Sequence, residues 1–134
     1  MNFKERSTEQ EIMDDPNIDL VALKKVFVDI NRVNRVLNGN AITLQAIGKM
    51  LYENPQSGYT IMDLGCGDGN MLKQLAVYFK GRFISLNLIG VDLNGNAIRI
   101  ARENCRDFSN ISFLQQDILT LDTLVPSCDI LLCS

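Results

Sequence analysis

The sequence predicts an α/β fold in which a parallel sheet is covered by helices. Three observations carry this prediction. Four short apolar segments have the composition of buried parallel strands. Helical stretches separate these segments, so each strand can reach the next by a right-handed crossover. A glycine-rich turn at residues 65–69 joins the first strand to a helix, which is the arrangement of a nucleotide-type binding site.

The chain before the first strand is expected to be helical. Residues 19–37 carry an apolar stripe with a 3.6-residue period, and the Asn-Gly-Asn sequence at 38–40 ends it. A second helix is expected over residues 41–53. A short leading helix is expected over residues 5–14, ended by Pro16. The inward positions of the two longer helices are predicted to be Leu20, Leu23, Val26, Phe27, Ile30, Val33 and Leu37, followed by Ile42, Ala46, Ile47, Met50 and Leu51.

The first strand is predicted at residues 59–64, and a helix is predicted at 70–80. The glycines between them allow a sharp turn and a close approach of the backbone to a ligand. Their spacing is G-x-G-x-G, preceded two residues earlier by Asp63, whereas a dinucleotide fingerprint is G-x-G-x-x-G. A tight glycine-rich turn without a ligand is the alternative interpretation.

With this motif the chain resembles the class I S-adenosylmethionine-dependent methyltransferases, whose first motif is commonly h-h-D-h-G-C-G-x-G. The resemblance implies a Rossmann-like sheet with S-adenosylmethionine as the cofactor. Its methionine end would lie over residues 65–67, so Asp63, Gly65, Cys66 and Gly67 are candidate cofactor-binding residues. The small side chain of Cys66 also suits tight packing inside the turn.

The second strand is predicted to end at Asp92, followed by Leu93. An acidic group at this place can accept hydrogen bonds from both ribose hydroxyls, and Leu93 is a candidate residue of the same site. Alternatively, Asp92 is a turn residue before the next helix, which Asn94 could also cap. Dinucleotide enzymes use an acid in the same way, so Asp92 indicates a ribose more firmly than a particular cofactor.

The third strand is predicted over residues 111–118 and ends at Asp117 and Ile118. By resemblance, Asp117 would bind the adenine amino group and the backbone N–H of Ile118 would meet a ring nitrogen. The alternative is that Asp117 caps a short helix over residues 118–124. One residue could serve both purposes.

The fourth strand is predicted over residues 128–134. In the family this strand lies beside the first, and its C-terminal end, here at Cys133, approaches the methionine part of the cofactor. The family core has the strand order 3-2-1-4-5-7-6, so we interpret the chain as a fold truncated after the fourth strand, with order 3-2-1-4. The unpaired edge at residues 130–133 then predicts self-association, most economically as a homodimer.

Two segments are expected: an N-terminal helical lid or cap at residues 1–57, and a partial S-adenosylmethionine-binding domain at 58–134. In small-molecule methyltransferases such leading helices often cover cofactor and substrate. Arg32, Asn34 and Arg35 could then reach the cofactor carboxylate, although side chains that merely face solvent are the plainer interpretation.

Composition excludes several classes of protein. The net charge of −3 and the lack of a basic run argue against nucleic acid as a partner. The sequence has no stretch of 18 apolar residues, so it indicates no membrane-spanning helix. Four cysteines without a C-x-x-C pair, and no histidine, make a zinc site improbable. Reduced thiols and an N-terminus too polar for a signal peptide favour the cytoplasm.

The expected function is methyl transfer from S-adenosylmethionine to a small molecule, by in-line displacement at the sulfonium methyl. The protein would act mainly through proximity and orientation. No catalytic residue is identified, and a base would come from an acid, from further chain or from the substrate. The alternatives are an NAD-dependent oxidoreductase, which leaves Asp63 and Asp117 unexplained, and a cofactor-binding fragment without turnover.

Overall fold

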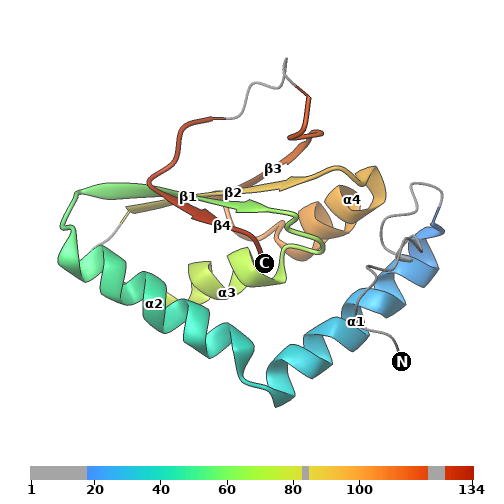
Figure 1. The fold of residues 1–134 in the computed structure, drawn as a ribbon, viewed down its shortest axis with the longest axis horizontal. Helices are drawn as coiled ribbons and strands as arrows, with labels where there is room; N and C mark the ends of the chain where they lie inside the picture. The colour runs from blue at the N-terminus through green and yellow to red at the C-terminus, as the bar shows by residue number, and fades with distance from the viewer. Residues whose placement is uncertain (1–17, 83–84, 121–125) are drawn as a thin grey trace, which may run out of the picture.

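The computed structural model describes residues 18–82, 85–120 and 126–134, and these form a parallel four-stranded sheet with helices (Figure 1). The strand order β3-β2-β1-β4 confirms the predicted Rossmann-like arrangement. All three strand pairs are parallel, and β1 lies in the interior, between β2 and β4. The strands are β1 (Gly58–Leu64), β2 (Ser85–Asp92), β3 (Ile111–Gln115) and β4 (Ile130–Leu132).

Four helices are described, and Figure 1 shows all of them on the same side of the sheet. Two of them, α3 and α4, make the crossovers that connect β1 to β2 and β2 to β3. The other two precede the sheet and meet at an elbow, where Asn38 adopts the left-handed conformation with φ of 57°. The helices are α1 (Leu20–Val36), α2 (Gly39–Glu53), α3 (Asn70–Tyr78) and α4 (Gly95–Asn104).

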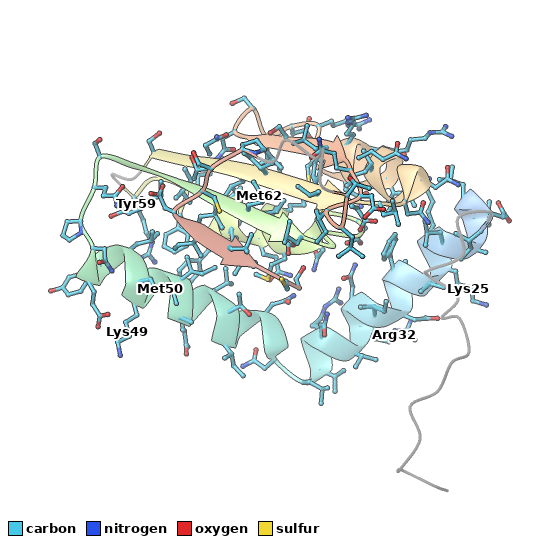
Figure 2. The ribbon with its side chains drawn as sticks, turned by 45° about the horizontal axis from the view of Figure 1, so that its top comes forward. Lys25, Arg32, Lys49, Met50, Tyr59 and Met62 are labelled. Atoms are coloured by element: carbon cyan, nitrogen blue, oxygen red, sulfur yellow. The ribbon has the colours of Figure 1, made fainter. Side chains whose placement is uncertain are left out.

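The main core lies between the sheet and the helices. Alternating side chains of β1 point to opposite faces, so Ile61 joins this core while Met62 joins a smaller cluster on the other face. Leu72 and Leu75 of α3 are fully buried in the main core. In Figure 2, Met62 lies within the sheet, whereas the exposed Lys25 and Lys49 stand on the outer helices.

Helix α1 is held at its N-terminal half. The carboxylate of Asp19 accepts a hydrogen bond from the Val21 N–H (3.1 Å) and caps the helix. Leu23 and Phe27 pack with residues of α4 in a buried cluster. Leu20 is partly buried against this cluster, whereas the later residues of the predicted stripe are exposed, with Val33 at 54%, because the second half of α1 extends beyond α4 toward the elbow.

In helix α2, too, only some of the residues predicted to face inward are buried in the structure. Ile47 and Leu51 are buried as predicted, because they face the main core. The predictions for Ile42 and Met50 were wrong, since these side chains are 68% and 49% exposed. A 3.6-residue period identifies a face of a helix, but it does not say how much of that face another element covers.

Two of the predicted short helices fall on segments that the structure does not describe. Residues 5–14 lie outside the described ranges. Of the predicted helix 118–124, residues 118–120 form a turn and the remainder lies outside the described part. Among the described residues, no helix has both the length and the apolar character needed to cross a bilayer.

Candidate functional site

The glycine turn between β1 and α3 has a backbone that requires glycine. Gly65, Gly67 and Gly69 have φ values of 72°, 55° and 76°, in the left-handed region. The N–H groups of Gly65 and Cys66 both donate to the carbonyl of Val91 (2.8 and 3.1 Å), which fixes the turn to the end of β2. The turn is therefore a rigid extension of the sheet.

The two outer faces of this turn differ. A Cβ added at Gly67 would lie 2.9 Å from Cε1 of Phe27, because α1 packs against the turn there. A Cβ added at Gly65 would meet no atom of the described residues within 4 Å. The backbone at Gly65 is therefore open to a ligand, while the backbone at Gly67 is covered by an aromatic ring of α1.

Asp92 lies at the end of β2, half-buried, with its carboxylate directed to two backbone N–H groups. Its Oδ2 accepts from Gly67 (2.9 Å), and its Oδ1 accepts from Asn94 (2.9 Å). Each carboxylate oxygen retains a second acceptor site, so a diol could still bind there. Asp92 is therefore a turn residue, as the alternative interpretation of the sequence had it, and it could still bind a ribose.

Asp63 is fully buried at the end of β1. Its two oxygens accept hydrogen bonds from the backbone N–H (3.1 Å) and the hydroxyl (2.6 Å) of Ser134. Burial raises the pKa of Asp63, and the hydrogen bonds from Ser134 partly oppose that rise. Asp63 therefore joins the ends of two neighbouring strands and could reach a ligand only through Ser134.

Asp68, in the middle of the turn, connects α1 to α3. Its Oδ1 accepts from the backbone N–H of Asn70 (3.1 Å), and its Oδ2 accepts from Nδ2 of Asn31 in α1 (2.7 Å). Only 9% of Asp68 is exposed. Sequence reasoning missed this pair, because its two residues lie 37 positions apart and neither stands out locally.

A cavity of about 170 Å³ lies between α1 and the glycine turn. It brings together Gly65, Cys66 and Gly67 of the predicted site, with Asp63 behind Ser134 and Asp92 behind Gly67. The lining residues are Phe27, Ile30, Asn31, Asn34, Asn40, Gly65, Cys66, Gly67, Asp68, Asn70, Met71 and Ser134.

Cys66 is a packing residue of the turn. Its side chain is buried, and a Cβ at Gly90 of β2 would lie only 2.8 Å from its sulfur. Burial raises the pKa of the Cys66 thiol strongly, and the carboxylate of Asp92 raises it further. The group stays protonated at neutral pH, so it is not a nucleophile.

The remaining predicted site residues lie at the same carboxyl edge of the sheet but outside this cavity. Leu93 and Ile118 are 66% and 46% exposed. Asp117 accepts the backbone N–H of Leu119 through Oδ1 (2.9 Å), so it stabilises a turn. Cys133 is exposed, next to Ser134. Within the described ranges, no group of three or more His, Cys, Asp or Glu side chains could hold a metal ion.

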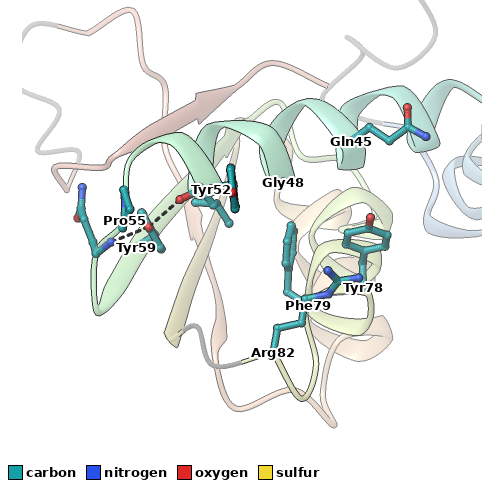
Figure 3. A pocket seen from close by; sticks show the side chains of 10 residues that line it. Gln45, Gly48, Tyr52, Pro55, Tyr59, Tyr78, Phe79 and Arg82 are labelled. Carbon is teal, nitrogen blue, oxygen red and sulfur yellow. Dashed lines mark hydrogen bonds between the residues drawn. The ribbon is translucent and has the colours of Figure 1, made fainter.

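A larger cavity, of about 570 Å³, lies at the opposite end of β1 (Figure 3). Tyr52, Tyr78 and Phe79 line it, and the guanidinium of Arg82 lies 4.8 Å from the centre of the Tyr78 ring. The hydroxyl of Tyr59 accepts from the Gln56 N–H (2.7 Å) and lies 2.6 Å from the Asn54 carbonyl. In open parallel sheets, ligands bind outside the carboxyl ends of the strands, and this cavity lies at the amino end.

Comparison with known proteins defines the class. Residues 55–134 match the model of the family described as "Methyltransferase domain", which is more than half of the chain. The chain therefore belongs to this methyltransferase domain family, and the resemblance drawn from its motifs is confirmed.

Two curated relatives align with parts of the chain. Methyltransferase phqN from Penicillium fellutanum is 32% identical over 72 residues, which cover 52% of this chain and 21% of that protein. The 23S rRNA (uracil(1939)-C(5))-methyltransferase RlmD from Marinomonas sp. is 33% identical over 92 residues, which cover 67% of this chain and 19% of that protein. The chain thus spans about a fifth of the length of these relatives.

A solved structure extends the likeness to the N-terminal helices. The plantazolicin methyltransferase BpumL, in complex with a desmethylPZN analogue and SAH, superposes with a TM-score of 0.62. The match covers 91% of this chain and 43% of that one at 20% identity, so it shows a shared fold and nothing about function. Helices before the sheet are therefore part of a fold already seen in a methyltransferase.

Proposed function

We propose that this chain binds S-adenosylmethionine at the carboxyl end of its sheet and supplies the cofactor-binding part of a small-molecule methyltransferase. The observation that carries the proposal is the open backbone at Gly65, beside a turn that Asp92 fixes from β2. A Cβ at Gly65 would fill space that no atom of the described residues occupies. Membership of the methyltransferase domain family supports the same cofactor.

The proposed roles follow the order of the strands. Gly65, Cys66 and Gly67 would hold the methionine end, and Asp92 would accept hydrogen bonds from the ribose through its free lone pairs. When bound, the cofactor would supply an activated methyl group on its sulfonium. Asp63 would act indirectly, by holding Ser134 at the wall of the cavity.

The adenine would lie at the ends of β2 and β3. Asp117 would accept from its amino group, and the Ile118 N–H would meet a ring nitrogen. The exposed apolar side chains of Leu93 and Ile118 suit the faces of a flat ring. Cys133 would lie near the methionine part, at the end of β4.

The N-terminal segment, residues 1–57, is proposed as the lid of this site. Two contacts of α1 with the glycine turn support that role, the packing of Phe27 over Gly67 and the hydrogen bond from Asn31 to Asp68. The partial domain at 58–134 would then hold the cofactor, while α1 excludes water from one side of it. The net charge of −3 favours a small molecule over nucleic acid as acceptor.

Calorimetry with S-adenosylhomocysteine, S-adenosylmethionine and NAD tests the cofactor. We expect one molecule of either adenosyl compound to bind per chain and NAD to show no binding. Binding of NAD alone would replace the proposal with an oxidoreductase. Transfer of a labelled methyl group from S-adenosylmethionine to small acceptors would separate an enzyme from a binder without turnover.

Self-association through β4 is proposed as well. Ile130–Leu132 pairs with β1 on one side, and no described strand lies on its other side. Leu131 is 55% exposed and uncharged, which suits pairing with a second copy. Sedimentation at micromolar concentration should show a dimer that Leu131→Lys weakens, and a monomeric wild type would refute this proposal.

We also propose a cytoplasmic location for the protein, since its four free cysteines agree with a reducing compartment.

A further inference from the structure

A second polar cavity, of about 230 Å³, is lined by residues of α1, α2 and α3 and by Asn38 at the elbow between α1 and α2. It adjoins the cavity at the glycine turn, because Asn31, Asn34, Asn40 and Asn70 line both. None of residues 65–69 lines it. The lining residues are Asn31, Asn34, Arg35, Asn38, Asn40, Ala41, Leu44, Asn70 and Gln74.

The lining is unusual in its chemistry. Five asparagines, one glutamine and one arginine surround the space, and no carboxylate of residues 18–82, 85–120 or 126–134 lines it. Arg35 forms no ion pair within residues 18–82, 85–120 and 126–134, where the pairs are Lys24–Glu103 and Lys49–Glu53. Apart from the Asn31–Asp68 bond, these amide side chains make no hydrogen bond to another described residue. Their donors are therefore available to a ligand.

A guanidinium surrounded by amide donors recognises an oxyanion. Arginine presents paired N–H groups that match the two oxygens of a carboxylate or phosphate, and asparagine amides add neutral donors without a competing negative charge. The left-handed Asn38 turns the chain at the elbow and brings the residues of α2 opposite Arg35 of α1. The fold thus builds this donor set from three helices.

We propose that this elbow cavity binds the carboxylate or phosphate of an acidic methyl acceptor, with Arg35 as the recognition residue. The inference rests on the proposed function, since it assigns the adjoining cavity at the glycine turn to the cofactor. An acceptor held by its anionic group here lies across the shared asparagines from the cofactor. The cofactor carries a carboxylate too, so the test must separate the two sources.

The test titrates inorganic phosphate into the 134-residue chain saturated with S-adenosylhomocysteine, at constant ionic strength. Side-chain amide signals of Asn34, Asn38 and Gln74 are followed by NMR. We expect saturable shifts in the wild type and at least about tenfold weaker binding in Arg35→Gln. Arg106→Gln is the matched control, because Arg106 is an exposed arginine outside the lining and away from α1. Equal behaviour of the two variants, or no saturable shift, overturns the proposal.

The affinity for S-adenosylhomocysteine, measured with and without phosphate, then identifies the source of the anion. Independent binding supports an acceptor site. Competition would show that the cavity holds the carboxylate of the cofactor, and the acceptor assignment would be wrong. If S-adenosylhomocysteine does not bind at all, the proposed function and the acceptor assignment fail together. The phosphate titration of the free chain still shows whether Arg35 binds an anion.

Discussion

The two ends of the parallel sheet have opposite characters. At the amino end, a cavity of about 570 Å³ is walled by aromatic rings, and the hydroxyl of Tyr59 is surrounded by backbone partners. At the carboxyl end, a cavity of about 170 Å³ is walled by a left-handed glycine turn and polar side chains. The buried Asp68 is part of this second wall, and the buried Asp63 lies directly behind it at Ser134.

This difference between the two ends shows that the volume of a cavity does not identify the functional site in this molecule. The features described at the amino end are packing and internal contacts, with the Tyr59 hydroxyl bonded to the backbone and Arg82 lying over the Tyr78 ring. The carboxyl end holds a turn of three left-handed residues that glycine alone adopts without strain, and a buried carboxylate whose desolvation must be compensated by other interactions. Such features are expected where a ligand is bound, and the predictions below test this contrast in order of decreasing effect.

The largest expected effect belongs to the amino end and concerns stability alone. Phe79 is 5% exposed and contributes to the main core, so Phe79→Ala should lower the free energy of unfolding by about 3–5 kcal/mol. The affinity for S-adenosylhomocysteine should not change. Urea unfolding and calorimetry measure the two quantities. Tyr52→Ala, in the same cavity but 86% exposed, is the control and should stay within about 0.5 kcal/mol of wild type. Lost binding in folded Phe79→Ala would extend the site to this end.

A smaller loss of stability, with loss of binding, is expected at the glycine turn. Gly67→Val places a branched side chain at φ of 55° and against Phe27, so unfolding should become easier by about 2–4 kcal/mol. Gly65→Ala also places a side chain on a left-handed backbone, but it does so without a steric clash. It should therefore lower the free energy of unfolding by about 1–2 kcal/mol. Both variants should lose affinity for S-adenosylhomocysteine. Normal binding by folded Gly65→Ala would remove the open face from the site.

Asp92 should affect binding more than folding. Asp92→Ala removes the carboxylate that would face the ribose, and we expect S-adenosylhomocysteine to bind about 1–3 kcal/mol more weakly. Some of this loss would come from the turn, because Gly67 loses its acceptor. Asp107→Ala, at an exposed position, is the charge-matched control for calorimetry. Equal affinities for the two variants would exclude Asp92 from the site.

The fold was predictable from the sequence because its signals are local. Strand composition, the glycine turn and the helical crossovers predict a parallel sheet, and the order 3-2-1-4 is what the resemblance carried by these motifs implies. The failures occurred where burial depends on a partner. The period of α1 named Val33 as an inward residue, but the residue is exposed, because α2 and α3 lie against the side of this part of the helix that carries Asn31 and Asn34.

Only those residues of the candidate site that belong to a local sequence motif were predictable. Gly65, Gly67 and Asp92 follow from the motif and the end of a strand. The bonds that hold the site together were not predictable, because Asp63 and Ser134 lie 71 positions apart and no local pattern links them. The elbow cavity is non-local as well, since α1, α2 and α3 each contribute part of its lining.

The smallest expected effect is a pH dependence that only the carboxyl end should show. Burial places the folded-state pKa of Asp63 above 3.8. Below pH 3.8 both states carry the proton, and the wild type is not penalised. As pH rises through the folded-state pKa, the unfolded state releases its proton more readily, so the free energy of unfolding falls. Urea unfolding of wild type and Asp63→Asn, compared between about pH 4 and pH 7, should show this fall as a loss in the wild type relative to the variant that grows as pH rises.

Ser134→Ala sharpens the same measurement. The variant removes the hydroxyl that donates to Asp63 at 2.6 Å and keeps the backbone N–H at 3.1 Å. Since the side-chain bond opposes the rise, its loss should move the pKa of Asp63 higher. The fall in unfolding free energy should then extend to higher pH than in the wild type. Tyr59→Phe, at the amino end of the same strand, should leave the shape of the curve unchanged. Parallel curves for wild type and Asp63→Asn would mean that the buried acid carries no such penalty, and the contrast between the two ends of the sheet would rest on the glycine turn alone.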